Sequence, residues 1–379
     1  MNETIEQILS DIATVGNMRA IPGADMAGGI DFSSNDYLGL SVRTDLRDGF
    51  FATLRPDDIQ MSASASRLLA GRQSAFTAFE RCLKEAYAGR DALLFNSGYH
   101  ANTGITSAFA GSGYYILADK LVHASIIDGI RLSGLPFARF RHNDYGHLAR
   151  LAEKTSRDGY KLIIIAESVY SMDGDRADID ALAEIKRRYQ DSILYIDEAH
   201  AVGVEGPGGL GMCMASSSYD DIDIIVGTLG KALASTGAYA TLKSPLRSFM
   251  VNKARSLIFS TALPPLCVKW SQYIFEKSLG MEAEREQLRR LSQILANELL
   301  TIGAKGYVSH IQGVICGTPQ RAVQLSHKLA EEGFTVLPIR TPTVPPGTDR
   351  LRLSLSANIT PTQISSLGSA LRKLYEING

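Results

Sequence analysis

The sequence predicts an α/β fold, with a large domain built on a mostly parallel sheet and a smaller α+β domain at the C-terminus. Between about residues 75 and 245, short apolar runs alternate with amphipathic segments, each unit being close to the ~30 residues of a strand–helix repeat. After this region the pattern changes to a long amphipathic helix and a strictly alternating strand. The 379 residues also suffice for two hydrophobic cores.

The first amphipathic segment is predicted to be a helix that ends near Gly89. Phe76, Phe79, Leu83 and Tyr87 recur at helical spacing, and a glycine is the usual residue just beyond a helix C-terminus. Short runs rich in β-branched residues then suit strands that are covered on both faces. These runs are LLF (93–95), KLIIIAES (161–168), SILYIDEAH (192–200) and DIDIIVGT (221–228).

The C-terminal part is predicted to combine a long helix with an antiparallel sheet. The helix carries an apolar face and is closed by Gly303. That face is formed by Leu288, Leu291, Leu295, Leu299 and Ile302. In RLRLSLS (350–356) polar and leucine residues alternate, which predicts a strand with one buried and one wet face. We therefore expect an N-terminal arm over 1–40, a large domain over 41–244 and a small domain over 245–379.

The composition excludes several classes of protein. Lys and Arg total 39 against 40 Asp and Glu, so no overall field attracts nucleic acid or anionic lipid. The four cysteines lie far apart and form no C-x-x-C pair, which argues against a zinc site and a disulfide framework. The first twenty residues hold no apolar block, and nowhere do eighteen uncharged apolar residues run together. We expect a soluble, cytoplasmic protein.

The residues that follow the apolar runs are the first candidates for a binding site, because ligands of open parallel sheets lie beyond the carboxyl ends of the strands. NSGYHANTG (96–104) follows LLF. Gly98 allows close backbone approach, and the N-terminus of the following helix would attract a phosphate. A single glycine turn is more often an ordinary strand–helix connection, so this motif alone is a weak signal.

A carboxylate follows the run LYI, in the sequence Asp197-Glu198-Ala199-His200. A carboxylate at a buried strand end needs a cationic or N–H partner to remain ionised. It could instead cap a helix or lie in a solvated turn. A metal site is disfavoured, because adjacent positions alternate in direction and no further ligand cluster is evident.

Lys231 lies between an apolar run and a segment rich in Gly, Ala and Ser. Most lysines are solvated surface groups. Burial at this position would lower the pKa of the amine and leave it reactive, as a Schiff base requires. His123 could stack on a ring, although a lone histidine more often caps a helix or fills a core.

These features together match the requirements of pyridoxal phosphate. The aldehyde needs Lys231, and the protonated ring nitrogen needs Asp197. The phosphate needs a helix N-terminus and hydroxyls such as those of Ser171 and Thr228.

The sequence resembles the α-oxoamine synthases, pyridoxal-phosphate enzymes of fold type I. The matching motifs occur in the family's order along nearly the whole chain. They are FSSNDYLGLS (32–41), NSGYHANTG, DKLVHASIIDG (119–129), RFRHND (139–144), ESVYSMDGD (167–175), YIDEAHAVGVEGPGGLG (195–211), GTLGKAL (227–233), FSTALPP (259–265) and PTVPPGTDRLRLSLSA (342–357). The resemblance implies a sheet of the seven-stranded type and a homodimer with shared active sites.

The resemblance also implies residue roles. Lys231, His123, Asp197 and His200 match the catalytic residues, with Lys231 binding the cofactor aldehyde and His200 bonding its ring hydroxyl. Gly98, Tyr99, Ser171 and Thr228 match further cofactor contacts, and Ser260 and Thr261 match residues that reach the neighbouring subunit's phosphate. Arg19, Asn35, Arg340, Thr343 and Arg352, together with His123, match substrate-binding positions.

The closing motif most resembles the biotin-pathway branch of the family. This implies decarboxylative condensation of L-alanine with pimeloyl-CoA, or with pimeloyl-acyl carrier protein, to 8-amino-7-oxononanoate. The alternatives within the family are glycine C-acetyltransferase, 5-aminolevulinate synthase, serine palmitoyltransferase and autoinducer synthase activities. MSASASRLLAG (61–71) and Phe76 depart from the family pattern, and both bear on the acyl donor.

Two hypotheses from other functional classes have less support in the sequence. A nucleotide-binding dehydrogenase would show G-x-G-x-x-G after its first strand and an acidic residue about twenty positions later, and the sequence shows neither. A cofactor-free scaffold would have no use for Lys231 and Asp197 together, since polar groups at buried strand ends are most often functional.

Overall fold

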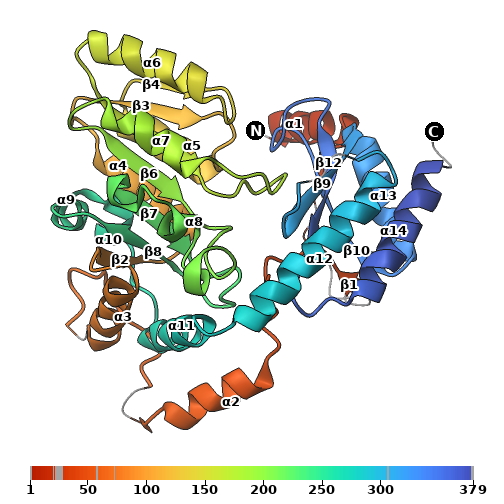
Figure 1. The fold of residues 1–379 in the computed structure, drawn as a ribbon, viewed down its shortest axis with the longest axis horizontal. Coiled ribbons are helices and arrows are strands. Elements are labelled where there is room, and N and C mark those ends of the chain that lie inside the picture. The colour runs from red at the N-terminus through yellow and green to blue at the C-terminus, as the bar shows by residue number, and fades with distance from the viewer. Residues whose placement is uncertain are drawn as a thin grey trace. The chain divides into compact units, whose positions relative to one another are not determined.

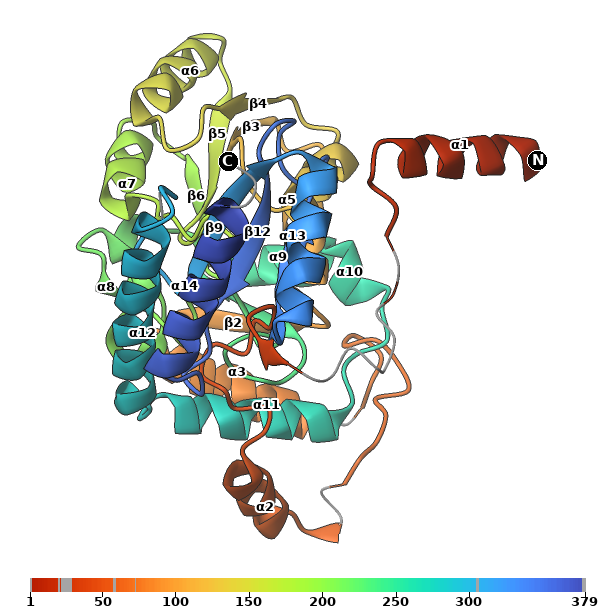
Figure 2. The same ribbon diagram turned by 90° about the vertical axis from the view of Figure 1, so that its right-hand side faces the viewer.

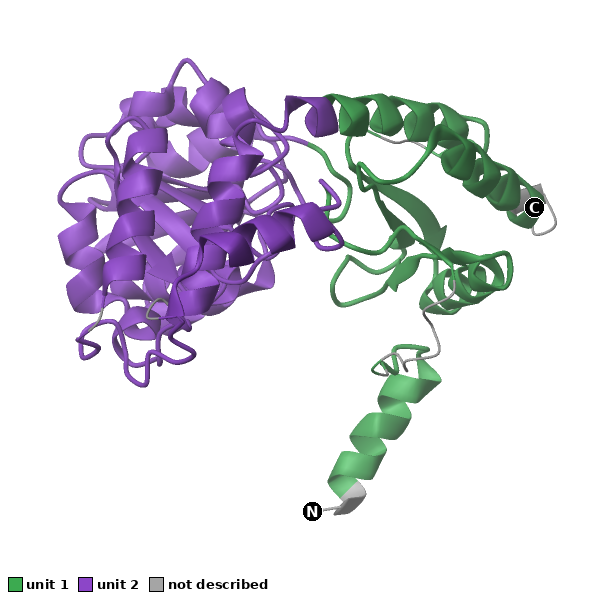
Figure 3. Cartoon of the chain, turned by 90° about the horizontal axis from the view of Figure 1, so that it is seen from below, with its two compact units in different colours: residues 1–37, 171–175, 286–379 green, residues 38–170, 176–285 purple. Residues whose placement is uncertain are grey.

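The computed structural model describes residues 2–19, 21, 29–56, 59–71, 73–304 and 307–376. The chain divides into two compact units, which Figure 3 shows in different colours. Unit 1 consists of residues 1–37, 171–175 and 286–379, and unit 2 consists of residues 38–170 and 176–285.

Unit 2 is built on a seven-stranded sheet (Figure 1). In spatial order the strands are β2 (Asp91–Phe95), β8 (Ala238–Leu242), β7 (Ile224–Thr228), β6 (Ile193–Asp197), β5 (Lys161–Glu167), β3 (Tyr114–Asp119) and β4 (Phe137–Phe140). The pairs from β7 to β4 are parallel, and only β8 runs antiparallel to its neighbours. The prediction of a mostly parallel, seven-stranded sheet is therefore confirmed.

Helices cover both faces of this sheet, which explains why its strands read as continuous apolar runs. On one face, Ile163 and Ile165 of β5 share a core with α4 (Gly98–Ala108), α5 (Ala124–Ser133), α9 (Leu246–Lys253) and α10 (Arg255–Ile258). On the other face, Ile164 and Ala166 share a core with α6 (Tyr145–Arg157), α7 (Ile179–Arg187) and α8 (Met212–Ala215). Successive residues of each strand thus alternate between the two cores.

The remaining helices of unit 2 lie at the β2 side of the sheet. The predicted helix ending near Gly89 is α3 (Ser74–Ala86), and Gly89 has a positive φ of 86°. It packs against β2 and against α11 (Pro265–Ser278), where the rings of Phe79 and Phe275 lie 5.7 Å apart. α2 (Thr44–Thr53) precedes it, and two short 3-10 helices cover Pro207–Gly209 and Tyr219–Asp221.

Unit 1 contains a three-stranded antiparallel sheet in the order β11 (Leu337–Ile339), β12 (Asp349–Ser354) and β9 (Ile311–Gly317). α13 (Pro319–Glu331) packs on β9 and β12 and contacts α14 (Pro361–Glu376), as Figure 2 shows. α12 (Glu282–Leu300) is the predicted long helix, and α1 (Asn2–Thr14) lies at the N-terminus. The prediction of an antiparallel C-terminal sheet is confirmed.

The prediction that one face of this sheet is exposed to solvent is wrong. Arg350 and Arg352 are each 5% exposed, and Ser354 is 1% exposed. Residues 171–175 belong to unit 1 and pack here: Asp173 pairs with Arg350, and the Ser171 carbonyl accepts from Arg352 Nε at 2.6 Å. These polar partners allow the polar face to be buried.

The compact units divide the chain at other points than the predicted domains. Met250, Ala254 and Leu257, beyond the expected boundary at 244, lie in the core of unit 2, which continues to Arg285. The first 37 residues group with the C-terminal part, where β1 (Ile30–Asp31) pairs in parallel with β10 (Phe334–Thr335).

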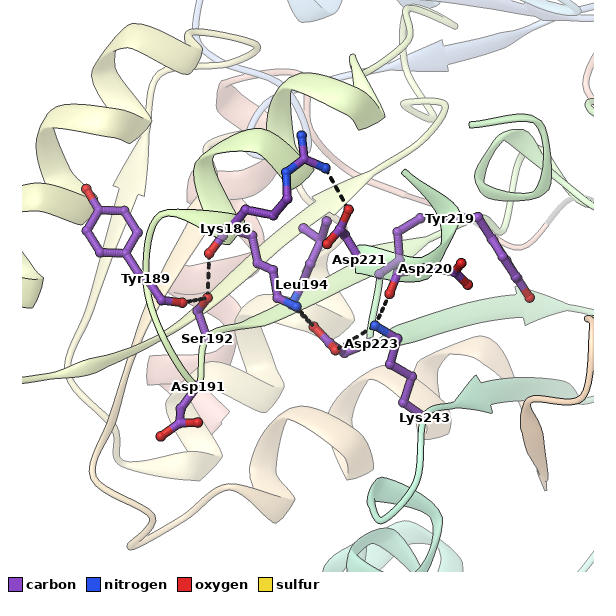
Figure 4. A network of polar contacts seen from close by, with 12 residues as sticks. Lys186, Tyr189, Asp191, Ser192, Leu194, Tyr219, Asp220, Asp221, Asp223 and Lys243 are labelled. Carbon is purple, nitrogen blue, oxygen red and sulfur yellow. Dashed lines mark hydrogen bonds and ion pairs between the residues drawn. The ribbon is translucent and has the colours of Figure 1, made fainter. Parts of the chain in front are cut away.

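A polar network holds the amino-terminal ends of the central strands (Figure 4). The Asp223 carboxylate accepts from the Leu194 N–H at 2.8 Å and forms ion pairs with Lys186 at 3.2 Å and Lys243 at 3.4 Å. The Ser192 hydroxyl donates to the carbonyls of Lys186 and Tyr189. The network connects β6 and β7 at their amino-terminal ends. It therefore does not occupy the carboxyl ends of these strands.

Among the described residues, no helix is long and apolar enough to cross a membrane, and no group of three or more His, Cys, Asp or Glu could hold a metal ion.

Candidate active site

The candidate side chains of unit 2 lie together at the carboxyl ends of the parallel strands, because alternate residues of a strand point to the same face of the sheet. Ile193 and Tyr195 of β6 face the α4 and α5 core, so Asp197, two residues further on, faces the same side. Thr228 follows Ile224 and Val226 of β7 in the same way. The aspartate and the hydroxyl therefore share one edge of one face of the sheet.

Asp197 is buried and held by N–H donors. Only 3% of the residue is exposed. Its Oδ2 accepts from Asn102 Nδ2 at 2.7 Å, and its Oδ1 accepts from the Ala199 N–H at 2.8 Å. Such donors favour the ionised form of a buried carboxyl group. The two hydrogen bonds thus hold the Asp197 carboxyl group in a defined orientation.

His123 stands at the N-terminus of α5. Its Nδ1 lies 2.7 Å from the Ser125 hydroxyl and 3.2 Å from the Ser125 N–H, which donates to it. Because Nδ1 accepts from a main-chain N–H, the network assigns the proton of the neutral ring to Nε2. Desolvation by the surrounding protein lowers the pKa of His123; Asp197 opposes this effect, and Lys231 adds to it. The ring is therefore a neutral donor at Nε2.

Lys231 follows β7 and is half-buried. Its Nζ lies 2.6 Å from Nε2 of His200, which is 4% exposed. Its charge also acts on the pKa of His123 and of Glu167. The amine is thus placed among the candidate residues rather than directed into bulk solvent.

Gly98 opens α4 beside Thr228. A Cβ at Gly98 would lie 3.8 Å from the Thr228 hydroxyl oxygen. The Ser97 hydroxyl accepts from the His100 N–H, while the main-chain N–H groups of Gly98 and Tyr99 have no acceptor within the helix. Two N–H groups and one hydroxyl therefore form an anion-binding surface.

The other candidates of unit 2 lie around this helix start. Tyr99 is 48% exposed, and its hydroxyl donates to Asp128 at 2.6 Å, a bond that raises the tyrosine pKa. Thr261 is exposed, Ser260 is half-buried, and the Thr261 carbonyl accepts from Asn96 Nδ2 at 2.7 Å. Ser260 and Thr261 thus lie beside the residue that precedes Ser97.

The other candidates belong to unit 1 and form two groups. Arg352 donates to the Ser171 carbonyl, to Ser354, to Asn35 at 3.0 Å and to Tyr37 at 3.4 Å. Arg19 donates to the Thr343 hydroxyl at 3.1 Å, and Arg340 donates to two main-chain carbonyls of residues 16 and 18. The guanidinium of Arg352 is therefore already engaged by the protein.

Sequence reasoning missed the residues that connect Asp197 to His123. Asn102 Nδ2 also donates to Ser125 Oγ at 2.9 Å, and the Tyr195 hydroxyl donates to Asn102 Oδ1. An asparagine inside a buried helix is unusual enough to have been a signal. Glu167 was missed too, although it ends a buried strand as Asp197 does.

A family model described as "Aminotransferase class I and II" matches residues 27–371. The chain belongs to the aminotransferase class I and II family. A relative from Haemophilus ducreyi named 8-amino-7-oxononanoate synthase is 43% identical over 380 residues, covering 96% of this chain and 98% of that protein.

Solved structures agree with the family assignment. An 8-amino-7-oxononanoate synthase from Francisella tularensis superposes with a TM-score of 0.77 at 28% identity, covering 92% of this chain and 99% of that one. A serine palmitoyltransferase from S. paucimobilis, solved with PLP and myriocin bound, superposes with a TM-score of 0.89 at 25% identity, covering 99% and 98%. This aminotransferase-family chain thus has the fold type I architecture that the sequence predicted.

Proposed function

We propose that this chain condenses L-alanine with a pimeloyl thioester, carried by coenzyme A or by acyl carrier protein, in biotin biosynthesis. The products are 8-amino-7-oxononanoate, carbon dioxide and the free thiol carrier. The observation that carries the proposal is the gathering of Lys231, Asp197 and a neutral His123 at one edge of the sheet. The 43% identity to a relative named for this product supports the choice of substrates.

The donor set fits pyridoxal phosphate. The N–H groups at the start of α4 and the Thr228 hydroxyl suit the phosphate, and the Lys231 amine suits the aldehyde. The buried Asp197 carboxylate suits a protonated ring nitrogen, and His200 suits the ring hydroxyl. When bound, this cofactor supplies an electron sink that makes the Cα proton and the carboxylate of an amino acid labile.

Lys231 has the second role of general base. Its Nζ would take the Cα proton of an amino acid bound at this site. His200 Nε2, 2.6 Å from that nitrogen, holds it in place. The base therefore needs no movement across the site.

His123 serves the acyl donor. Its Nε2–H is the hydrogen-bond donor left after Nδ1 has bonded to Ser125. It would donate to the thioester carbonyl oxygen as negative charge develops there, and its ring face would contact the cofactor ring.

Substrate binding falls to the residues of unit 1 named above. Arg19, Asn35, Arg340 and Thr343 are proposed to hold the substrate carboxylate or the acyl chain. Arg352 is proposed to bind the substrate as well, and its bond to Asn35 would orient both side chains.

The second candidate is a serine palmitoyltransferase activity, which the TM-score of 0.89 to such an enzyme favours. That similarity comes with 25% identity, against 43% to the 8-amino-7-oxononanoate synthase. Fold type I enzymes share a backbone across many substrates, so sequence identity weighs more than superposition.

The proposal includes a cytoplasmic homodimer in which Ser260 and Thr261 reach the phosphate of the other subunit. Its support is their position at an exposed or half-buried loop beside Asn96. Sedimentation of the PLP-loaded protein should give a dimer, and S260A combined with T261A should weaken PLP binding. A monomer with full activity would contradict this part of the proposal.

The experiment that tests the proposed function is a substrate panel read by product mass. Alanine, glycine and serine are each combined with acetyl, succinyl, pimeloyl and palmitoyl thioesters of coenzyme A, and the pimeloyl thioester is also tested on acyl carrier protein. Alanine with a pimeloyl thioester should give 8-amino-7-oxononanoate, and the K231A variant should give none. A product from serine and palmitoyl-CoA instead would overturn the assignment.

A further inference from the structure

Glu167 is a second buried carboxyl group at the edge that holds Asp197. It ends β5, is 2% exposed, and is in register with Asp197 of the neighbouring parallel strand β6. Residues in register on adjacent strands point to the same face, with their strands about 4.8 Å apart. Two buried carboxyl groups therefore stand side by side beneath the candidate cofactor site.

Two such groups cannot both be ionised at low cost, because like charges in a desolvated site repel each other strongly. The donors decide which one carries the charge. Asp197 accepts from two N–H groups, at 2.7 and 2.8 Å. For Glu167 the structure gives one, the main-chain N–H of His123, at 2.5 Å from Oε1. Asp197 is thus bonded by more N–H donors than Glu167 is.

The surroundings of Glu167 also favour its protonated form. Burial, and next to it the charge of Asp197, raise the pKa of Glu167 well above its usual range, and Asp119 of β3 adds to the increase. Lys231, from the segment after β7, and the His123 N–H oppose it. The phenols of Tyr170 and Tyr195, whose own pKa values are raised by burial, also interact with Glu167.

We infer that Glu167 is a positioning residue: a carboxylic acid that fixes the main chain of His123 and adds no negative charge of its own beside Asp197. The inference rests on the proposed cofactor site, because His123 and Asp197 are the residues that it serves. Glu167 needs to touch neither cofactor nor substrate.

The protonation of Glu167 matters for His123. A second anion so close would favour the imidazolium form, in which Nδ1 carries a proton. A protonated Nδ1 could no longer accept from the Ser125 N–H, which lies 3.2 Å away. A neutral Glu167 therefore keeps both the ring position and the Nε2 tautomer of His123.

Two variants separate the hydrogen bond from the charge. Glu167→Gln keeps an oxygen acceptor and is neutral at every pH, so PLP affinity of the refilled apoprotein should stay within about twofold of the unchanged protein. Glu167→Ala removes the acceptor from a buried N–H and should weaken PLP binding about five- to tenfold. The matched control is Glu153→Gln on α6, whose side chain is 57% exposed and which should change nothing.

Infrared spectroscopy of the PLP-free protein provides the second readout. In the E198Q background at neutral pH, the carbonyl band of a buried carboxylic acid should be present, should disappear when E167Q is added, and should persist when E153Q is added. Glu198 is another buried carboxyl group with a raised pKa, so the E198Q protein removes its contribution. Absence of the band from the E198Q protein would contradict the inference even if both Glu167 variants fail to fold.

The inference is overturned if E198Q shows no carboxylic acid band at neutral pH, or if E167Q binds PLP as weakly as E167A. Neither measurement uses alanine or a thioester. Both results could therefore still be interpreted if the proposed condensation were disproved.

Discussion

Asn102 connects the two residues on which the proposed chemistry depends. One amide nitrogen donates to Asp197 at 2.7 Å and to Ser125 at 2.9 Å, and Ser125 in turn holds the His123 ring. Residues that orient functional groups without touching the substrate typically account for 10- to 100-fold in activity, as at metal sites. The orientation of Asp197 and His123 is therefore set by one side chain of α4.

We predict that Asn102→Ala lowers kcat by about 10- to 100-fold, because Asp197 and Ser125 each lose a donor. Steady-state kinetics with alanine and the pimeloyl thioester measure the effect. Asn252→Ala is the control, because Asn252 is exposed on α9 and donates to the Ser248 carbonyl of its own helix. Equal rates for the two variants would show that the network has no functional role.

Asp197→Asn should lower kcat at least about a hundredfold, because an amide supplies no negative charge to a protonated ring nitrogen. The variant should still fold, since its main-chain neighbours are unchanged, and thermal melting checks this point. Turnover like that of the unchanged enzyme would place the ring nitrogen elsewhere.

At the residue scale, the sequence revealed the side chains that are rare in their setting. Asp197 and Lys231 were found because charged groups seldom follow buried strands. The sequence did not reveal Asn102, Ser125 and Tyr195, because their roles come from contacts between elements that are distant in the sequence. Glu167 carried the same signal as Asp197 and could have been found.

At the scale of elements, the close packing of α4 and α5 positions Asn102 relative to His123. A Cβ at Gly129 of α5 would lie 2.8 Å from the Thr106 Cβ and 2.9 Å from the Asn102 carbonyl oxygen. Both atoms belong to the interior of α4, so neither can move aside cheaply. Gly129 is therefore required for the helices to approach.

Gly129→Ala should lower the free energy of unfolding by about 1–3 kcal/mol through overpacking. Urea denaturation monitored by circular dichroism measures it. The control is Gly146→Ala in α6, where the nearest atoms would be 3.5 and 3.6 Å from the new Cβ. A Gly129→Ala protein as stable as this control would mean that the two helices adapt freely.

The sequence predicted the strands of unit 2 well, because both faces of each are apolar and the runs stand out. It failed for the polar face of β12, since the alternation of arginine and leucine is also the pattern of a solvent-facing strand. Only the structure shows that residues 171–175, from a distant part of the chain, bury Arg350 and Arg352.

At the scale of the whole molecule, stability should depend on pH through Glu198. This residue points away from Asp197, accepts from the Cys213 N–H at 3.0 Å and is fully buried. Burial raises its pKa from 4.5 to about 7. Between these values the folded protein keeps a proton that the unfolded chain has lost, so this contribution to stability falls as the pH rises through the window.

Glu198→Gln should remove that dependence. The free energy of unfolding of the unchanged protein should fall, relative to the variant, by about 3 kcal/mol as the pH rises from 4.5 to about 7. Urea unfolding of the PLP-free proteins at several pH values across the window measures the difference. Parallel pH profiles would contradict the burial of a protonated Glu198.

The division of the chain into units was the least predictable property at this scale. The N-terminal residues join the C-terminal ones through the pairing of β1 with β10, and two-residue strands leave almost no sequence pattern. The helices after residue 245 join unit 2 because their apolar residues complete the core on the α4 face.

The proposed activity depends first on Lys231, which we propose to bind the aldehyde of pyridoxal phosphate. Borohydride reduction of the PLP-loaded protein, followed by digestion and peptide mass spectrometry, tests it most directly. We expect one pyridoxyl group, on the peptide containing Lys231, and none after reduction of the K231A variant. A pyridoxyl group on another lysine, or no label in a protein that still turns over substrate, would contradict it.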